Sequence, residues 1–300
     1  MRVLYCWDTA GINSIINHYM GETYDDHEGT VVMRRSHDPH GIYAYYSPSP
    51  LGRGKWSGTG RALQFYLVAT LRSPRRDILH VCANIGYTGL LRTFSMGGKV
   101  VLHYHGSDAR NIPYASRKAA EERADCILVA TPDLLEYEYA KEPVYLHNPV
   151  DTRLFAPLDD IPKNNRGLVF MAPDQNRKLT LQRLQDLGFG DVEWDLAARS
   201  HDTTEVGVVE QTISPRLRGI NNIRYGDMPS VLSKYQYYAE IYYNAAAGSW
   251  YTMDTTTGLQ AMSLGLNVVS PDGSVARELP PEHRPERVAK RVREIYDGLV

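Results

Sequence analysis

Residues 99–130 read KVVLHYHGSDARNIPYASRKAAEERADCILVA. The runs Val100–Leu102 and Cys126–Ala130 are apolar throughout, which is typical of parallel strands that are covered on both faces of a sheet. Residues 115–124, between them, predict a helix. A strand, a helix and a second strand in this order predict a parallel sheet with crossover helices.

The same alternation extends over the first half of the chain. We expect further strands at residues 3–7, 31–34, 78–83 and 144–146, and further helices at 11–20, 60–71, 89–95 and 132–139. This arrangement predicts a doubly wound α/β domain over residues 1–156.

A second, smaller α/β series follows a polar, proline-containing linker at residues 157–166. We expect strands at 168–171, 192–196, 222–225, 240–243 and 267–270, and helices at 179–187, 229–235 and 257–264. The sequence therefore predicts a second domain over residues 157–284.

Residues 285–300 predict an amphipathic terminal helix. Val288, Val292 and Leu299 recur at helical spacing, opposite a basic face that contains Lys290 and Arg291. We expect this helix to pack on a domain with its basic face in solvent. Binding to a membrane surface is the alternative interpretation.

Composition narrows the class of protein. The 300 residues carry 33 Lys and Arg against 35 Asp and Glu, which argues against a dedicated nucleic-acid binder because no overall positive field is present. Three cysteines, Cys6, Cys82 and Cys126, lie in apolar runs without CxxC spacing, which indicates buried thiols in a reducing compartment and no structural zinc. With no signal-peptide pattern and no apolar run long enough to span a bilayer, we expect a cytoplasmic protein.

Two strand ends carry residues suited to a ligand site. Asp8, Ala10 and Gly11 follow the first strand and open a helix, where backbone N–H groups can meet an anion or simply form a tight turn. His103 and His105 lie two residues apart at the end of another strand, so both side chains are expected on one face, with Asp108 nearby. A pair of hydrogen-bonded histidines and a metal pair are the alternatives, and the metal pair lacks a third ligand.

Five runs, taken in order, resemble glycosyltransferase family 4: KVVLHYHGSDAR (99–110), ADCILVATPDLLE (124–136), HNPVDTRLF (147–155), YGDMPSVLSKY (225–235) and LQAMSLGLNVVS (259–270). This resemblance implies the GT-B fold, in which two Rossmann-like domains face each other across a cleft and a C-terminal helix often crosses back to the first domain. It implies a retaining glycosyltransferase that uses a nucleoside-diphosphate sugar and no metal or other cofactor.

The resemblance also assigns residues in the first domain. His105 corresponds to the family's cleft histidine, expected beside the transferred sugar, and Asp108 stands with it as a catalytic candidate. Ala10 and Gly11 correspond to the family's glycine-rich first turn, whose amides approach the donor.

In the second domain, Arg177 and Lys178 stand where the family binds the diphosphate, although Ala172–Pro173 replaces the usual Gly-Arg. Further donor contacts are implied for the base-side loop, the start of a helix and the ribose position, namely Tyr225, Gly226, Thr256, Thr257, Gly258 and Gln260.

Two positions depart from the family pattern. Gln260 replaces the glutamate that binds the ribose, and Thr252 replaces the glutamate that is placed near the sugar, with seven residues between the two positions and Asp254 close by. Glutamine can still accept hydrogen bonds, although weaker ones. The predicted function is therefore sugar transfer to a hydroxyl acceptor, saccharide or lipid-linked, with peripheral membrane association in the lipid-linked case. The alternative is a catalytically weak or inactive GT-B protein that binds nucleotide sugar or serves as a partner subunit.

Overall fold

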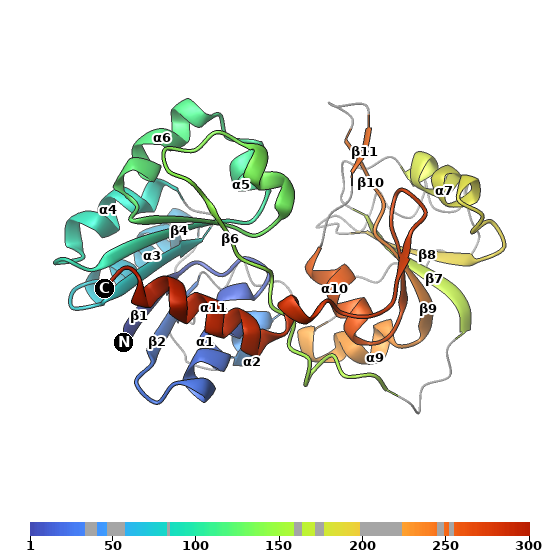
Figure 1. Cartoon of the computed structure of the whole chain (residues 1–300), viewed down its shortest axis with the longest axis horizontal. Helices are drawn as coiled ribbons and strands as arrows, with labels where there is room; N and C mark the ends of the chain where they lie inside the picture. The colour runs from blue at the N-terminus through green and yellow to red at the C-terminus, as the bar shows by residue number, and fades with distance from the viewer. Residues whose placement is uncertain are drawn as a thin grey trace. The chain divides into compact units, whose positions relative to one another are not determined.

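The computed structural model describes residues 1–33, 41–46, 58–82, 85–158, 164–171, 177–198, 224–244, 249–251 and 255–300. The chain forms two compact units (Figure 1). Unit 1 contains Met1–Pro149 together with Pro281–Val300, and unit 2 contains Val150–Pro280.

Unit 1 is built on a six-stranded, wholly parallel sheet in the order β2-β1-β3-β4-β5-β6. Its strands are β1 (Arg2–Cys6), β2 (Glu28–Val32), β3 (Ile78–Cys82), β4 (Lys99–Tyr104), β5 (Cys126–Val129) and β6 (Val144–Tyr145). Its helices are α1 (Ile12–Thr23), α2 (Ile42–Tyr46), α3 (Gly58–Arg72), α4 (Gly86–Phe94), α5 (Ser107–Arg110), α6 (Tyr114–Arg123), the short 3₁₀ helices η3 (Pro132–Glu136) and η5 (Pro281–His283), and α11 (Pro285–Asp297).

Both faces of this sheet are covered, as its continuous apolar strands predict. Tyr5 and Val101 point to a core that α1 and α11 close. Leu4 and Val100 alternate to the opposite face, where they pack with residues of α3 and α4. Because both side-chain rows of each central strand are buried, the sheet has no polar face there.

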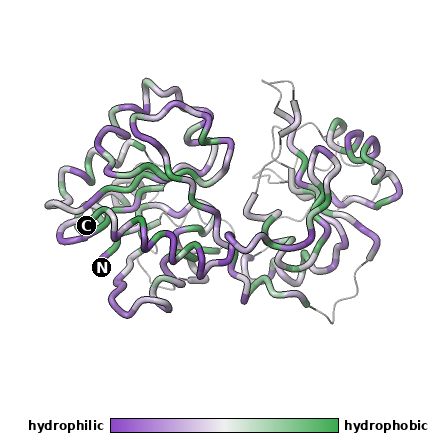
Figure 2. The backbone as a smooth tube through the Cα atoms, in the orientation of Figure 1, coloured by the Kyte–Doolittle hydropathy of each residue, from purple (hydrophilic) through white to green (hydrophobic). Residues whose placement is uncertain are grey.

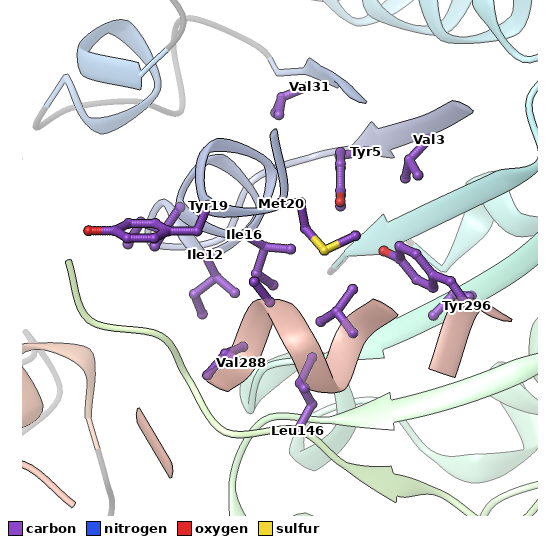
Figure 3. Close-up of a cluster of buried hydrophobic side chains, with 14 of the residues drawn as sticks. Val3, Tyr5, Ile12, Ile16, Tyr19, Met20, Val31, Leu146, Val288 and Tyr296 are labelled. Carbon is purple, nitrogen blue, oxygen red and sulfur yellow. The ribbon is translucent and has the colours of Figure 1, made fainter. Parts of the chain in front are cut away.

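The terminal helix α11 belongs to unit 1. Figure 3 shows Val288 and Tyr296 of this helix turned toward Ile12, Ile16 and other residues of α1. This arrangement confirms the predicted helix that returns to the first domain. It also means that the apolar face of α11 is buried within the protein and is not available to a membrane.

Unit 2 is built on a five-stranded sheet in the order β13-β12-β9-β7-β8. Its strands are β7 (Asn164–Met171), β8 (Glu193–Ala198), β9 (Tyr235–Ala239), β12 (Asn267–Val269) and the antiparallel edge strand β13 (Val275–Ala276), beside a separate hairpin of β10 (Tyr242–Asn244) and β11 (Ser249–Tyr251). Its helices are α7 (Arg177–Asp186), the 3₁₀ helix η4 (Tyr225–Asp227), α9 (Met228–Leu232) and α10 (Thr256–Ser263).

Several predicted elements, most of them in unit 2, are wrong. The expected helix 229–235 ends at Leu232, and the strand expected at 240–243 is instead β9 at Tyr235–Ala239, followed by the hairpin. Residues 235–243 read YQYYAEIYY, and the tyrosines and the isoleucine on both sides of Ala239 and Glu240 favour a strand, so side-chain pattern alone does not set where the sheet strand begins. Tyr225, predicted to end a strand, lies in η4. The helix expected at 132–139 is only the short η3.

Hydrophobic residues concentrate in the strands of both sheets (Figure 2). Among the described residues, the structure contains no helix long and apolar enough to cross a bilayer.

Candidate functional site

The carboxyl ends of β1, β3 and β4 lie side by side at one edge of the unit 1 sheet, because these three strands are neighbours and parallel. Asp8 follows β1, Cys82 ends β3, and His105 follows β4. The topology therefore brings together the two segments that the sequence singled out.

The turn between β1 and α1 has a strained backbone. Ala10 and Gly11 adopt positive φ angles of 52° and 78°. A Cβ atom on Gly11 would lie 2.1 Å from Cγ2 of Ile42, so glycine is required for packing against α2. The requirement for glycine is therefore explained by this contact within the protein.

Asp8 caps the start of α1. Its buried carboxylate accepts hydrogen bonds from the amides of Asn13 at 2.8 Å and Ser14 at 3.3 Å, and from the Ser14 hydroxyl. A negative charge at a helix start is favourable because it meets unsatisfied N–H groups and the positive end of the helix dipole. The Asp8 carboxylate thus occupies the helix start at which the sequence suggested that the anion of a ligand binds.

A chain of polar side chains runs beneath this edge on the face that α1 and α11 cover. The Tyr296 hydroxyl lies 2.5 Å from Nδ1 of His80, and Nε2 of His80 lies 3.1 Å from Nδ1 of His103. The His103 ring packs on the His105 ring with 4.1 Å between centroids. This arrangement links helix α11 to His105 through two buried histidines.

Cys82 connects His105 to the first helix. Its sulfur lies 3.1 Å from Nε2 of His105 and accepts a hydrogen bond from Nδ2 of Asn13 at 3.0 Å. Asn13 also donates to the carbonyl of Trp7 at 2.7 Å. Asn13 and Cys82 therefore hold the His105 ring against the turn that follows β1.

Burial keeps this cluster neutral. Burial, and secondly His105, lowers the pKa of His80 to about 3, while burial lowers the pKa of His105 to about 4 against a smaller opposing effect of Asp108. The pKa of His103 is lowered well below its ordinary value, chiefly by burial. Burial also raises the pKa of the Cys82 thiol. At neutral pH these are uncharged imidazoles and a thiol.

Two ring nitrogens of the cluster have no partner among the described residues. They are Nε2 of His103 and Nδ1 of His105, and both atoms are buried. His103 itself is fully buried, whereas His105 is half-buried. His105 is therefore the least buried histidine of the cluster, although Nδ1 of its ring is itself buried.

Asp108 has a role that needs no substrate. Its carboxylate accepts hydrogen bonds from the amides of His105 at 3.0 Å and Gly106 at 2.7 Å, at the start of α5. These bonds fix the backbone just before α5 and hence the direction of the His105 side chain. The geometry makes Asp108 a positioning residue for His105.

His80, Cys82 and His103 are the residues of the described part that could hold a metal ion, with ligand atoms within 4.8 Å of one another. Imidazole and thiolate suit zinc. Each of the three already has a hydrogen-bonding partner in the protein.

In unit 2, β7 and β9 are neighbours, with Val169 opposite Ala239 near their carboxyl ends. The helices α7 and α10 come after these strands in the chain, so the sheet topology directs both helix starts to the same edge. Arg177 and Lys178 open α7, but their side chains lie outside the described part of the structure, as do Ala172, Pro173, Thr252 and Asp254.

The start of α10 is organised by a residue that sequence analysis missed. Glu240 is buried directly after β9, and its carboxylate accepts a hydrogen bond from the Thr255 amide at 2.6 Å. Thr255 in turn accepts one from the Gly258 amide at 3.0 Å through its hydroxyl. A Cβ on Gly258 would lie within 2.5–2.7 Å of the Glu240 carboxyl group, so this glycine makes room for the acid.

The remaining donor-site candidates differ in exposure. Thr256 and Thr257 provide the first amides of α10, which have no acceptor in the described part of the chain. Tyr225 is buried against Phe155 with 5.5 Å between ring centroids, whereas Gly226 is exposed. Gln260 is buried within α10.

No protein-family model matches this sequence, and no curated protein sequence matches it. Solved structures do match. A sucrose-phosphate synthase from Thermosynechococcus elongatus is 12% identical, with a TM-score of 0.63, over 100% of this chain and 99% of its own. Anabaena HepE in complex with UDP and glucose is 11% identical, with a TM-score of 0.57, over 100% and 91%. A UDP-GlcNAc 2-epimerase from Neisseria meningitidis bound to UDP-GlcNAc is 12% identical, with a TM-score of 0.56, over 98% and 99%.

The chain has the GT-B fold. Within it, the structure brings His105, Asp108, Ala10 and Gly11 to one sheet edge of unit 1. It directs the starts of α7 and α10, with Thr256, Thr257 and Gly258, to the corresponding edge of unit 2.

Sequence reasoning missed Cys82, which contacts His105, and the residues that continue the network behind it. His80 and Cys82 form a pair two residues apart on a strand, the same pattern as His103 and His105, and this signal was available in ILHVC at residues 78–82. Asn13 and Tyr296 carried no such signal, because their role depends on α1 and α11 packing over the sheet.

Proposed function

We propose that this protein is a retaining glycosyltransferase that moves a sugar from a nucleoside-diphosphate sugar to a hydroxyl acceptor without a metal. The observation that carries the proposal is the half-buried, neutral His105 at the carboxyl edge of the first sheet of a GT-B fold, held beside the first strand-to-helix turn through Cys82. Ligands of parallel α/β sheets bind at this edge.

In the proposed reaction, His105 contacts the transferred sugar as a neutral imidazole. Its Nε2 is engaged by Cys82, and its buried Nδ1 has no partner among the described residues, so we assign Nδ1 as the atom that meets a sugar hydroxyl. Asp108 fixes the backbone of His105, and Asn13 fixes Cys82. Such preorganisation lowers the cost of placing a polar group against the reacting carbon.

The second sheet edge holds the leaving group in this proposal. Arg177 and Lys178 bind the diphosphate together with the free amides of Thr256 and Thr257, because cations and helix starts both favour phosphate oxygens. Tyr225 and Gly226 lie on the base side, and Gln260 binds the ribose. The departing phosphate oxygen takes the proton of the acceptor hydroxyl, so no separate protein base is required.

A second candidate is a GT-B protein that binds nucleotide sugar without turnover. It is favoured by two observations in α10, where Gln260 provides no carboxylate and the buried Glu240 places a negative charge at the helix start. A carboxylate near the diphosphate weakens binding of that anion.

Thermal-shift screening of the full chain against nucleoside-diphosphate sugars identifies the donor. NMR of the reaction with that donor and a panel of hydroxyl acceptors then follows the anomeric carbon. We expect a glycoside with the donor's anomeric configuration. Binding without turnover over the whole acceptor panel supports the second candidate, and an epimerised nucleotide sugar formed without acceptor contradicts transfer.

A further inference from the structure

One buried face of the unit 1 sheet carries three side chains of the types that bind transition metals. His80 and Cys82 lie two residues apart on β3, so both point to one face, and Cys82 pairs with His103 on the neighbouring strand β4. One ligand atom of each residue lies within 4.8 Å of the other two, and all three side chains are buried. Because the set spans two strands, it lacks the CxxC spacing by which zinc sites are found in a sequence.

The three ligand atoms are close enough to share one ion. In a tetrahedral zinc site the ligand atoms lie about 3.3–3.6 Å from one another, since the bonds to the metal are about 2.0–2.1 Å for nitrogen and about 2.3 Å for sulfur. Side-chain movements of about 1 Å bring separations of up to 4.8 Å into that range. Two imidazoles and a thiolate suit zinc, whereas magnesium and calcium take oxygen ligands.

Two of the three side chains are already oriented by neighbours. The Tyr296 hydroxyl lies 2.5 Å from Nδ1 of His80, and Nδ2 of Asn13 donates to the Cys82 sulfur at 3.0 Å. Histidines that bind metals usually make such a bond through the other ring nitrogen, which fixes the nitrogen that faces the ion. Nε2 of His103 is buried and has no partner among the described residues, which costs free energy unless a ligand supplies one.

The surroundings of Cys82 favour a cation. Burial raises the pKa of its thiol, and the negative charges of Asp8 and Asp108 raise it further. The same negative charges stabilise a metal ion beside the sulfur. Zinc binds the thiolate, so the thiol proton passes to solvent when the ion binds. Both histidines are neutral at pH 7 and lose no proton, because burial lowers their pKa values.

We propose that His80, Cys82 and His103 bind one Zn²⁺ ion and that this ion inhibits the proposed sugar transfer. Nε2 of His105 lies 3.1 Å from the Cys82 sulfur. A sulfur that moves onto zinc no longer holds His105 in the same place, and a displacement of about 1 Å at a reacting group can cost about 100-fold in rate. Zinc binding does not depend on the proposed function, whereas the inhibition rests on it.

Titration of the full chain with Co²⁺, after treatment with a chelator, tests the metal site. Cobalt is the probe because a bond between Co²⁺ and a thiolate gives a charge-transfer band in the near ultraviolet. We expect this band to saturate at one equivalent of Co²⁺, and one equivalent of Zn²⁺ to remove it. This measurement uses the unaltered protein and needs no variant to fold.

Variants assign the ligands. Cys82→Ala should abolish the band, and His103→Phe should weaken Zn²⁺ binding by more than about 100-fold. Tyr296→Phe keeps all three ligands and removes only the partner of His80, so we expect a loss of about tenfold. The matched control is Cys6→Ala, at an equally buried cysteine on the neighbouring strand β1, which should bind Co²⁺ like the parent. Circular dichroism confirms that each variant folds.

Two results would overturn the metal site: the parent gives no thiolate band with Co²⁺, or Cys82→Ala binds Co²⁺ like Cys6→Ala. Inhibition is measured separately, as the rate of sugar transfer against Zn²⁺ concentration in the parent and in Cys6→Ala. We expect both rates to fall at least about tenfold, with half-inhibition at the Kd for Zn²⁺. Zinc binding that leaves the rate unchanged would overturn the link to His105. Zinc binding by a protein that transfers no sugar would contradict the proposed function and support the metal site.

Discussion

At each of the two sheet edges, a buried carboxylate accepts hydrogen bonds from backbone amides at the start of a helix. The two carboxylates come from different distances along the chain. In unit 1, Asp8 caps α1 by accepting a hydrogen bond from the Asn13 amide. Asp8 lies five residues before Asn13, within the same strand-to-helix connection. In unit 2, Glu240 caps the start of α10 by accepting a hydrogen bond from the Thr255 amide. Glu240 lies 15 residues before Thr255, with the hairpin β10–β11 between them. A buried carboxylate completes each helix start, but only the first of the two is visible as a local sequence motif.

The two units also differ in titratable groups. Nine of the ten histidines belong to unit 1, and His201 is the one histidine in the sequence of unit 2. Three of those nine form the buried cluster behind the first sheet edge. Carboxylates organise helix starts at both edges, and the first edge adds a cluster of buried, uncharged histidines.

The largest effect is expected from a change at His105, and it tests whether the two sheet edges have separate functions. His105→Ala should reduce the rate of transfer by a factor of about 100 to 10,000, the range for a positioned polar group at the reacting centre. Donor affinity should change little, because the diphosphate is assigned to unit 2. Steady-state kinetics and a donor titration measure both. His18→Ala, at an exposed histidine of α1, is the control, and equal losses of rate and affinity would contradict this division.

Acid should unfold unit 1 first. A histidine whose folded pKa lies below its unfolded value of about 6.5 leaves stability unchanged above that pH, and stability falls as pH drops toward the folded pKa. His80, with a pKa of about 3, should cost about 1.4 kcal/mol per pH unit between pH 6 and 4. Urea unfolding across this range, followed by hydrogen exchange in each unit, measures the slope.

His80→Phe should flatten that pH dependence in unit 1, whatever it does to stability at neutral pH. His18→Phe, at a side chain 40% exposed, should leave the slope as it is. If both variants retain the parent's slope, the buried cluster does not control acid unfolding.

Gly258→Ala tests the nonlocal cap in unit 2. The new Cβ would approach both carboxylate oxygens of Glu240, and overpacking of this kind costs about 1–3 kcal/mol. Chemical denaturation measures the loss. Combining Gly258→Ala with Glu240→Ala should give less than the sum of the two effects, because the clash is then absent. Additive losses would show that Glu240 does not occupy this space.

The smallest effect is expected at a glycine of unit 1 that packs against nothing. Gly21 lies inside α1, and a Cβ there would have no neighbour within 4 Å. Gly21→Ala should raise the free energy of unfolding by about 0.5–1 kcal/mol, since alanine favours the helix. A loss of stability in denaturation would mean that the helix is more closely covered than the contacts indicate.

The sequence alone determined the class of fold and much of its layout. Continuous apolar strands such as Val100–Leu102 required two covered faces, and the spacing of Val288 and Val292 required a helix with one buried side. The pairing of His103 with His105 on one strand face also followed from the period of a strand. These are local regularities, and they need no knowledge of distant contacts.

Only the tertiary structure decided which residues complete each edge. Tyr296 meets His80 across 216 residues, and Asn13 meets Cys82 across 69, through packing of α11 and α1 on the sheet. The strand expected to begin at Glu240 is instead β9, which ends at Ala239. The run YQYYAEIYY has strand-favouring tyrosines on both sides of Glu240, and pairing with β7 and β12 selected the register. Long-range packing assigns these partners, and no local pattern encodes it.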